Sequence, residues 1–171
     1  FVRLVGRAGG AAALRNASFR LLRGDVVVLL DDDAEPIAGY GEALRERFAV
    51  SPDAARPAIV QGAVWPAFDV DPPSAIEPVL FSVGGFNRLG ERRRTDVFIS
   101  ANCAFPRAVL DRTGPMREDL GPGGVGAGWG DDTEWHRRAS AAGFATEFDE
   151  RLAVRHRIQA ERLTEAYVLD R

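Results

Sequence analysis

The sequence has no lysine and a single cysteine, and each absence excludes a class of chemistry. All 22 basic residues of the 171 are arginine. This excludes mechanisms that need a lysine: Walker-A phosphate binding, Schiff-base and pyridoxal phosphate reactions, haloacid-dehalogenase-type phosphatases and protein kinases. The lone Cys103 excludes a disulfide scaffold and a cysteine-rich metal site. The longest purely aliphatic run, Val26 to Leu30, falls far short of the roughly 18 residues of a transmembrane helix, so we predict no transmembrane segment.

The charge is weakly negative and the hydrophobicity is ordinary. The 22 basic and 25 acidic residues give a net charge of −3, which argues against bulk electrostatic binding of nucleic acid or anionic lipid. Hydrophobic residues make up 46% and charged residues 27%, as is typical of a globular domain. The length corresponds to one domain. We therefore predict a single domain over residues 1–171, located in the cytoplasm, with the inner face of the membrane as the alternative location.

Strand-like and helix-like segments alternate along the chain. Val26–Leu30 is a continuous aliphatic run, which is typical of a strand buried on both faces of a parallel sheet. Further strands are predicted at Phe1–Val5, Ile59–Trp65, Asp96–Phe105, Phe144–Phe148 and Leu152–Arg155, and helices at Ala11–Leu22, Pro36–Ala49, Pro106–Arg112, Asp131–Ala142 and Ala160–Leu169. The alternation predicts an α/β fold. Because Phe1 already starts a predicted strand, we expect the chain to begin inside a fold, with upstream residues missing.

Three aspartates, Asp31-Asp32-Asp33, directly follow the strand Val26–Leu30. The carboxyl ends of strands are where open α/β sheets bind ligands. Three carboxylates crowded at such an edge are costly unless a cation binds there, and Mg²⁺ or Mn²⁺ prefers oxygen ligands of this kind. The alternative is a solvated acidic turn in which one Asp caps the next helix. The triplet alone leaves both interpretations open.

A second acidic group, Asp131-Asp132, opens a predicted helix after the glycine-rich segment 120–130. A carboxylate there can serve as a general base on a rigid helix end, facing a loop that can close. Helix capping and a favourable interaction with the helix dipole are the alternative. Trp129 and Trp135 flank the pair; Trp135 shares a helical face with alanines and is expected in the core, so Trp129 is the better candidate for ligand contact.

Three isolated polar residues complete the candidates. His156 ends a strand pattern, where a histidine is usually structural and metal ligation is the alternative. Arg15 lies on the first predicted helix, where it either binds a phosphate or remains solvated. Asn102 stands in an apolar run, so it either bonds neighbouring backbone or lines a pocket. The arginine-rich turn 88–94 is either an anion patch or a solvated turn.

The order and spacing of these segments resemble a known family. The matching stretches are Gly10–Asn16, Gly24-Asp25, Leu29–Pro36, Ser100–Arg107, Gly114–Gly121, Asp131–Glu134 and Val154–His156. Together they resemble family 2 glycosyltransferases of the GT-A fold, over nearly the whole chain. The resemblance implies a Rossmann-like sheet, mixed but mostly parallel and flanked by helices, without the family's first strand and helix. Residues 1–50 would form the nucleotide-binding part and 95–171 the acceptor and catalytic part.

The resemblance also implies a role for each candidate residue. The middle and last acids, Asp32 and Asp33, would form the Asp-x-Asp-type motif, with Asp33 as a metal ligand. Asp31 would face the ribose or the sugar, His156 would be a further metal ligand and Asp132 the catalytic base. Together with the candidates above, the expected nucleotide-sugar contacts are Arg15, Asp31, Asp32, Asn102, Trp129 and Asp131.

The implied activity is that of an inverting, Mg²⁺- or Mn²⁺-dependent glycosyltransferase. Its donor would be a nucleotide sugar, with UDP or TDP as the expected nucleotide, and its acceptor the hydroxyl of a glycan, a lipid-linked sugar or a protein. The metal would offset charge growing on the diphosphate, while the base takes the acceptor proton. Two alternatives remain open: a nucleotidyltransferase, and a non-catalytic domain of the same fold that binds carbohydrate or regulates.

Overall fold

The computed structural model describes residues 10–49, 59–94, 98–123 and 128–169. The predicted strand Phe1–Val5 lies outside these residues, as do parts of Asp96–Phe105 and of the glycine-rich segment 120–130. The chain divides into two compact units, which we describe separately. The first comprises Phe1–Val27, Ala55–Ile59 and Phe105–Thr146, and the second comprises Val28–Ala54, Val60–Ala104 and Glu147–Arg171.

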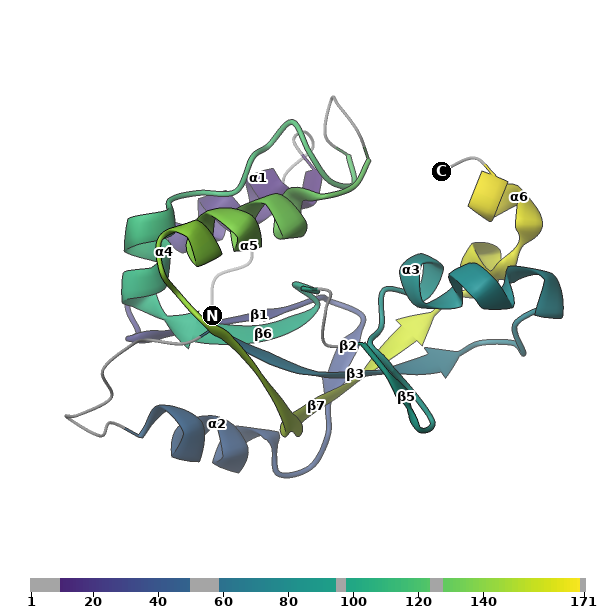
Figure 1. Cartoon of the computed structure of the whole chain (residues 1–171), viewed down its shortest axis with the longest axis horizontal. Coiled ribbons are helices and arrows are strands. Elements are labelled where there is room, and N and C mark those ends of the chain that lie inside the picture. Colours follow the sequence, from purple (N-terminus) through teal and green to yellow (C-terminus); the bar gives the residue numbers. More distant parts are fainter. Residues whose placement is uncertain (1–9, 50–58, 95–97, 124–127, 170–171) are drawn as a thin grey trace. The chain divides into compact units, whose positions relative to one another are not determined.

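A five-stranded sheet has the strand order β1-β6-β3-β7-β2. Its strands, labelled in Figure 1, are β1 (Val26–Leu30), β2 (Ala34–Pro36), β3 (Ile59–Phe68), β6 (Asn102–Pro106) and β7 (Thr146–Ile158). β2 pairs antiparallel with β7, and β3 pairs antiparallel with β6. The predicted α/β class is confirmed. The prediction of a mostly parallel sheet is wrong, because two of the four neighbouring pairs among the described strands are antiparallel.

Strand β1 has the predicted bounds but not the predicted burial. Val27 and Leu29 are buried, whereas Leu30 is exposed. Burial alternates along β1, so one face of the strand packs into the core and the other is more open. Among the described strands, β1 lies at one end of the strand order.

In the first unit, the described helices are α1 (Gly10–Phe19), α4 (Arg107–Thr113) and α5 (Asp131–Ala141). α4 and α5 pack side by side (Figure 1). Trp135 is fully buried, with its ring centroid 4.9 Å from that of Phe105. Its indole N–H donates a hydrogen bond to the Gly114 carbonyl at 2.9 Å. The prediction that Trp135 belongs to the core is confirmed.

The second unit packs its short helices against β3 and β7. These elements are α2 (Tyr40–Phe48), η1 (Ser74–Val79), α3 (Leu80–Gly84), η2 (Ala160–Leu163) and α6 (Glu165–Leu169), together with a hairpin of β4 (Arg88–Leu89) and β5 (Arg92–Arg93). The core includes Val60, Val64, Phe86, Leu152, Val154 and Ile158. Within the described residues, no helix is long and apolar enough to cross a membrane.

Several predicted boundaries in this unit are wrong for local reasons. Helix α2 begins at Tyr40, because Pro36 ends strand β2 and Gly39 adopts a left-handed φ of 89°. β7 is one strand where two were predicted, since no glycine or proline interrupts its acidic middle. The predicted C-terminal helix divides into η2 and α6 at Thr164, whose backbone is extended.

Buried amide side chains bond main-chain groups beside β3. Asn87 accepts a hydrogen bond from the Val64 N–H at 2.7 Å and donates one to the Gly62 carbonyl at 3.0 Å. Gln61 accepts from the Ile99 N–H at 2.8 Å and donates to the Ile99 carbonyl at 3.0 Å. Each amide supplies both a donor and an acceptor, as a neighbouring strand would.

Candidate functional site

A tight turn after β1 places the acidic triplet. The Ala34 N–H donates to the Asp31 carbonyl at 3.1 Å, so the chain reverses within four residues and enters β2. In the β2–β7 pairing, Ala34 lies opposite His156. The Arg157 N–H also donates to the Asp33 carbonyl at 3.0 Å. Main-chain pairing thus brings Asp33 beside His156, two residues that are far apart in the sequence.

Asp31, Asp33 and His156 form a group that could hold a metal ion. Each offers one ligand atom, and the three atoms lie within 4.8 Å of one another. The Nε2 atom of His156 is 2.9 Å from Oδ1 of Asp33. Asp32 is exposed and is not part of the group. Asp33 therefore lies with Asp31, the first acid of the triplet, because the turn brings alternate residues together. The predicted pairing was with Asp32.

The orientation of the His156 ring suits metal binding. Its Nδ1 atom is 3.1 Å from the Gly84 carbonyl. A carbonyl only accepts hydrogen bonds, so Nδ1 carries the proton, and in a neutral ring Nε2 presents a lone pair. That lone pair faces the Asp33 carboxylate. Two acceptors at this distance need a proton or a cation between them, and a backbone carbonyl at the second nitrogen is the usual support of a metal-ligating histidine.

One arginine side chain lies near the Asp33 carboxylate. The Nη2 atom of Arg162 lies 3.8 Å from Oδ2 of Asp33, beyond hydrogen-bond distance. The His156 side chain is 4% exposed and that of Asp33 is 20% exposed. Two carboxylate oxygens and one imidazole nitrogen form a donor set that suits Mn²⁺ or Mg²⁺. The residues present therefore fit a divalent cation.

The first unit holds a different carboxylate arrangement at the start of α5. Asp131 is buried, and its Oδ2 accepts a hydrogen bond from Nη1 of Arg15 at 3.0 Å. A Cβ atom added to Gly121, which has φ +80°, would lie 2.5 Å from the Asp131 carboxyl carbon. The Ala11 N–H donates to the Pro122 carbonyl at 3.1 Å. We call Arg15, Asp131 and Gly121 the arginine–aspartate junction; it ties α1 and the loop before α5 to the N-terminus of α5.

Asp132 follows this junction on the first turn of α5. Its Oδ1 accepts from the Thr133 N–H at 2.7 Å. His136 lies one turn further along, and burial lowers the pKa of its ring, with Asp132 acting in the opposite direction. Trp129, 43% exposed, precedes the helix. Asp132 and Trp129 belong to the first unit and the Asp31–Asp33–His156 group to the second.

Asn102 uses its side chain inside the second unit. Its amide nitrogen donates to the carbonyls of Ala63 at 3.1 Å and Leu152 at 2.8 Å, and its oxygen accepts from the Tyr40 hydroxyl at 2.9 Å. Burial raises the pKa of Tyr40 to about 12, with a smaller contribution from Cys103. Of the two roles left open for Asn102, the structure shows bonding to backbone, and we omit it from the donor site.

Sequence reasoning missed two supports of these groups. The Gly84 carbonyl fixes the His156 ring, and the adjacent glycine pair Gly84-Gly85, with φ +62° at Gly85, is the signal that could have drawn attention to it. Asn16 is buried and bonds both the N–H and the carbonyl of Met116, each at 2.8 Å. The contact joins residues 100 positions apart, and no local sequence pattern predicts it.

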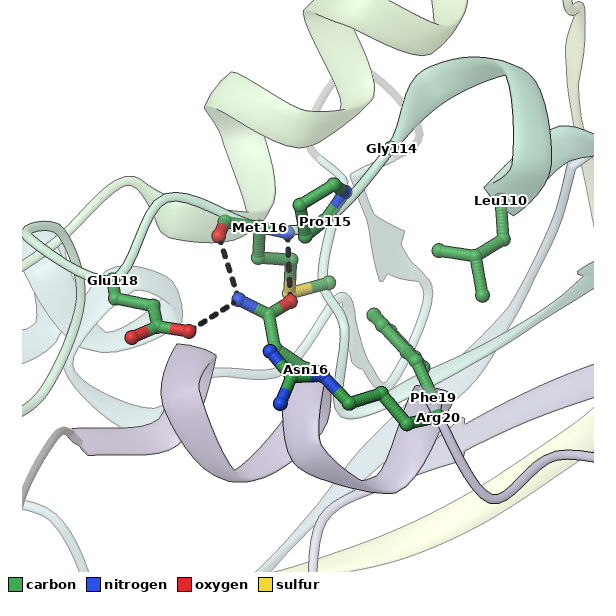
Figure 2. Close-up of a pocket in the computed structure, with 8 residues that line it drawn as sticks. All are labelled: Asn16, Phe19, Arg20, Leu110, Gly114, Pro115, Met116 and Glu118. Carbon is green, nitrogen blue, oxygen red and sulfur yellow. Dashed lines mark hydrogen bonds between the residues drawn. The ribbon is translucent and has the colours of Figure 1, made fainter.

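A pocket of about 470 Å³ lies beside Asn16 in the first unit. Figure 2 shows its lining and the bonds from Asn16 to Met116 and Glu118. The lining residues are Asn16, Phe19, Arg20, Leu110, Gly114, Pro115, Met116 and Glu118. None of the site residues predicted from the sequence lines this pocket.

Comparison with known proteins supports the fold. The sequence matches no protein-family model and no curated protein. A mannosyltransferase from Pyrobaculum calidifontis, solved in complex with GDP-mannose and Mn²⁺, is similar in structure, with a TM-score of 0.51 and 21% sequence identity. The match covers 86% of this chain and 36% of the mannosyltransferase, so this chain spans about a third of that protein's length. The chain has a fold similar to that of a glycosyltransferase.

Proposed function

We propose that this chain is part of a metal-dependent glycosyltransferase that moves a sugar from a nucleotide-sugar donor to a hydroxyl acceptor, with inversion. The observation that carries the proposal is the Asp31–Asp33–His156 group, with three converging ligand atoms and a histidine oriented by a backbone carbonyl. The similarity in fold to a mannosyltransferase supports it. The GT-A fold and family 2 membership are part of this proposal.

In the second unit, Asp33, His156 and Asp31 would hold the cation. Asp31 takes this role in place of the ribose or sugar contact that the sequence analysis expects, because its carboxylate converges with the other two ligand atoms. The bound cation would supply positive charge to offset the charge that develops on the diphosphate leaving group. The Gly84 carbonyl keeps the His156 ring in the orientation that presents Nε2.

In the first unit, Asp132 would act as the catalytic base and take the proton of the acceptor hydroxyl. Its neighbour Asp131 is paired with Arg15 and covered by Gly121. We therefore assign Asp131 to holding Arg15 and the start of α5 in place. Arg15 and Trp129 are the proposed contacts to the nucleotide sugar in this unit.

The fold similarity and the ligand set favour particular donor nucleotides and a particular metal. The resemblance to family 2 enzymes favours UDP or TDP, and the Pyrobaculum enzyme adds GDP because it was solved with GDP-mannose. An imidazole ligand favours Mn²⁺ over Mg²⁺, since Mg²⁺ prefers oxygen ligands and water.

The test is calorimetric titration of GDP, UDP and TDP into the folded chain, with and without Mn²⁺. We expect one nucleotide to bind in a Mn²⁺-dependent manner. Asp33→Asn should abolish that dependence, whereas Asp71→Asn, a change of an exposed aspartate outside the group, should not. A folded chain that binds none of the three nucleotides with Mn²⁺ would contradict the proposal.

A second assay separates the two alternatives. The chain is incubated with nucleotide sugars of the nucleotide that binds, together with a range of acceptors, and should release the nucleoside diphosphate. Asp132→Asn should stop this release while nucleotide binding persists. Release of pyrophosphate from a nucleoside triphosphate and a sugar phosphate would instead indicate a nucleotidyltransferase. Binding without any release would favour the non-catalytic domain.

A further inference from the structure

Arg88 is a largely buried arginine outside the proposed metal centre. It begins strand β4, in the second unit, and its side chain is 14% exposed. Its guanidinium carbon lies 4.8 Å from the centroid of the Trp65 ring. Stacking on an indole face holds the guanidinium in place but satisfies none of its N–H donors.

One donor of the Arg88 guanidinium is buried without a hydrogen bond in the described part of the chain. Its Nε atom is buried and has no hydrogen-bond partner among the residues that the structure describes. The nearby carboxylate of Glu150 is 3.8 Å from Nη1, which is an ion pair beyond hydrogen-bond distance. Glu150 is itself 48% exposed and takes part in another interaction. Buried charged donors without partners are costly, so the arrangement calls for an anion.

Two other arginines of the same unit differ from Arg88 in how their donors are satisfied. Arg92, on the partner strand β5, likewise lies over an aromatic ring, Phe81 at 5.5 Å, and has a long ion pair with Glu77 at 3.7 Å. Its side chain is 54% exposed, so water satisfies its donors. Arg157 instead makes two hydrogen bonds to the Asp69 carboxylate, at 2.8 and 3.0 Å.

We propose that Arg88, backed by Trp65, binds an oxyanion: a phosphate or carboxylate group of a ligand. The planar guanidinium matches both groups, because its N–H donors form a rigid fork that two oxygens of either can accept. The site needs no metal and draws on none of Asp31, Asp33 and His156. If the proposed function holds, the anion would belong to the substrate, and acceptors that carry a phosphate or a carboxylate would be preferred over neutral ones.

The test uses the chain in EDTA at low ionic strength, so that the metal centre does not contribute. Inorganic phosphate and acetate are titrated separately by calorimetry, with sodium chloride of equal ionic strength as the blank. We expect wild-type protein to bind at least one of them at millimolar concentration. Arg88→Gln should weaken binding at least tenfold, and the matched control Arg92→Gln should change it less than twofold. The preferred anion identifies the source, phosphate or carboxylate.

Arg88→Lys keeps the charge but removes the fork, so it should weaken binding several-fold in a folded protein. If a melting curve shows that Arg88→Gln is not folded, Arg88→Lys replaces it in the test. Absence of binding by the wild type, or equal losses in Arg88→Gln and Arg92→Gln, would overturn the proposal. Because the assay excludes metal and nucleotide, its result is independent of the proposed glycosyl transfer.

Discussion

Asp131 in the first unit and Asp33 in the second are similar carboxylates with opposite surroundings. Asp131 is buried and bonded to Arg15 at 3.0 Å, so the protein supplies its countercharge. Asp33 is partly open, faces the imidazole nitrogen of His156, and has its Oδ2 atom 3.8 Å from Nη2 of Arg162. The first carboxylate is paired with an arginine at hydrogen-bond distance, and the second converges with two further ligand atoms.

The difference shows how acidic residues in one chain separate into structural and functional groups. A carboxylate that is already hydrogen-bonded to an arginine gains little from a metal ion, whereas a cluster of acceptor atoms gains much. We therefore expect damage to the arginine–aspartate junction to reduce stability, and damage to the Asp31–Asp33–His156 group to reduce metal binding. The following changes test that separation, from the largest expected effect to the smallest.

Arg15→Ala should have the largest effect, a loss of about 3 kcal/mol in the free energy of unfolding, because it leaves the buried Asp131 charge unpaired. Urea denaturation followed by circular dichroism measures this loss. The control is Arg157→Ala, which breaks a pair on the exposed surface and should cost much less. Equal losses in the two variants would remove the distinction between the buried and the exposed pair.

Asp33→Asn should weaken Mn²⁺ binding about a hundredfold, which corresponds to about 2.7 kcal/mol, because it removes a ligand charge. Calorimetric titration with MnCl₂ measures the affinity. Asp32→Asn changes the neighbouring exposed carboxylate and should alter the affinity less than threefold. A large loss of Mn²⁺ affinity in Asp32→Asn would instead support the sequence-based prediction that Asp32 and Asp33 bind the metal together.

Gly121→Ala should cost about 2 kcal/mol more than Gly143→Ala. Both glycines have a left-handed φ, +80° and +90°, so both alanines carry similar backbone strain. A Cβ atom at 121 meets the Asp131 carboxyl group at 2.5 Å, whereas one at 143 meets nothing within 4 Å. The extra cost is the overpacking of the junction. Thermal melts of both variants provide the comparison. Equal melting midpoints would show that the arginine–aspartate junction accommodates the added Cβ atom without cost.

The smallest effect concerns Tyr40, a neutral group of the second unit. Its pKa of about 12 in the folded chain lies above the ordinary tyrosine value of 10.0, so the unfolded chain loses the phenol proton first. Stability from this group is full below pH 10 and falls as the pH rises from about 10 to about 12. Absorbance titration at 295 nm should show a step near pH 12 that Tyr40→Phe removes. If the late step survives in that variant, the assignment to Tyr40 is wrong.

The sequence predicted the local elements of the site well. The bounds of Val26–Leu30 are as predicted, and helix α5 ends within one residue of its predicted end. The structure brings together Asp33 and His156, both expected from the family resemblance to bind the metal. The agreement in element bounds depends on a continuous aliphatic run and on glycine before a helix, which are both visible in short stretches of sequence. The metal-binding roles of Asp33 and His156 remain predictions.

The sequence could not predict contacts that depend on how distant segments pack. Arg15 and Asp131 are 116 positions apart, and no local pattern shows that one neutralises the other. Which acid of the triplet joins Asp33 depends on the turn that begins at Asp31, set by its bond to Ala34 and by pairing with β7. The sequence left Asn102 with two possible roles, bonding to backbone or lining a pocket, and the structure shows that three partners from other segments occupy its amide.

The buried amides that bond backbone also determine what deamidation would do to the fold. Asn16, Asn87 and Asn102 each donate from nitrogen and accept at oxygen. Deamidation to aspartate would put a carboxylate, which cannot donate, against a buried carbonyl. A chain altered in this way cannot restore the buried hydrogen bonds that the amide nitrogen donated, so each such change should lower the stability of the fold.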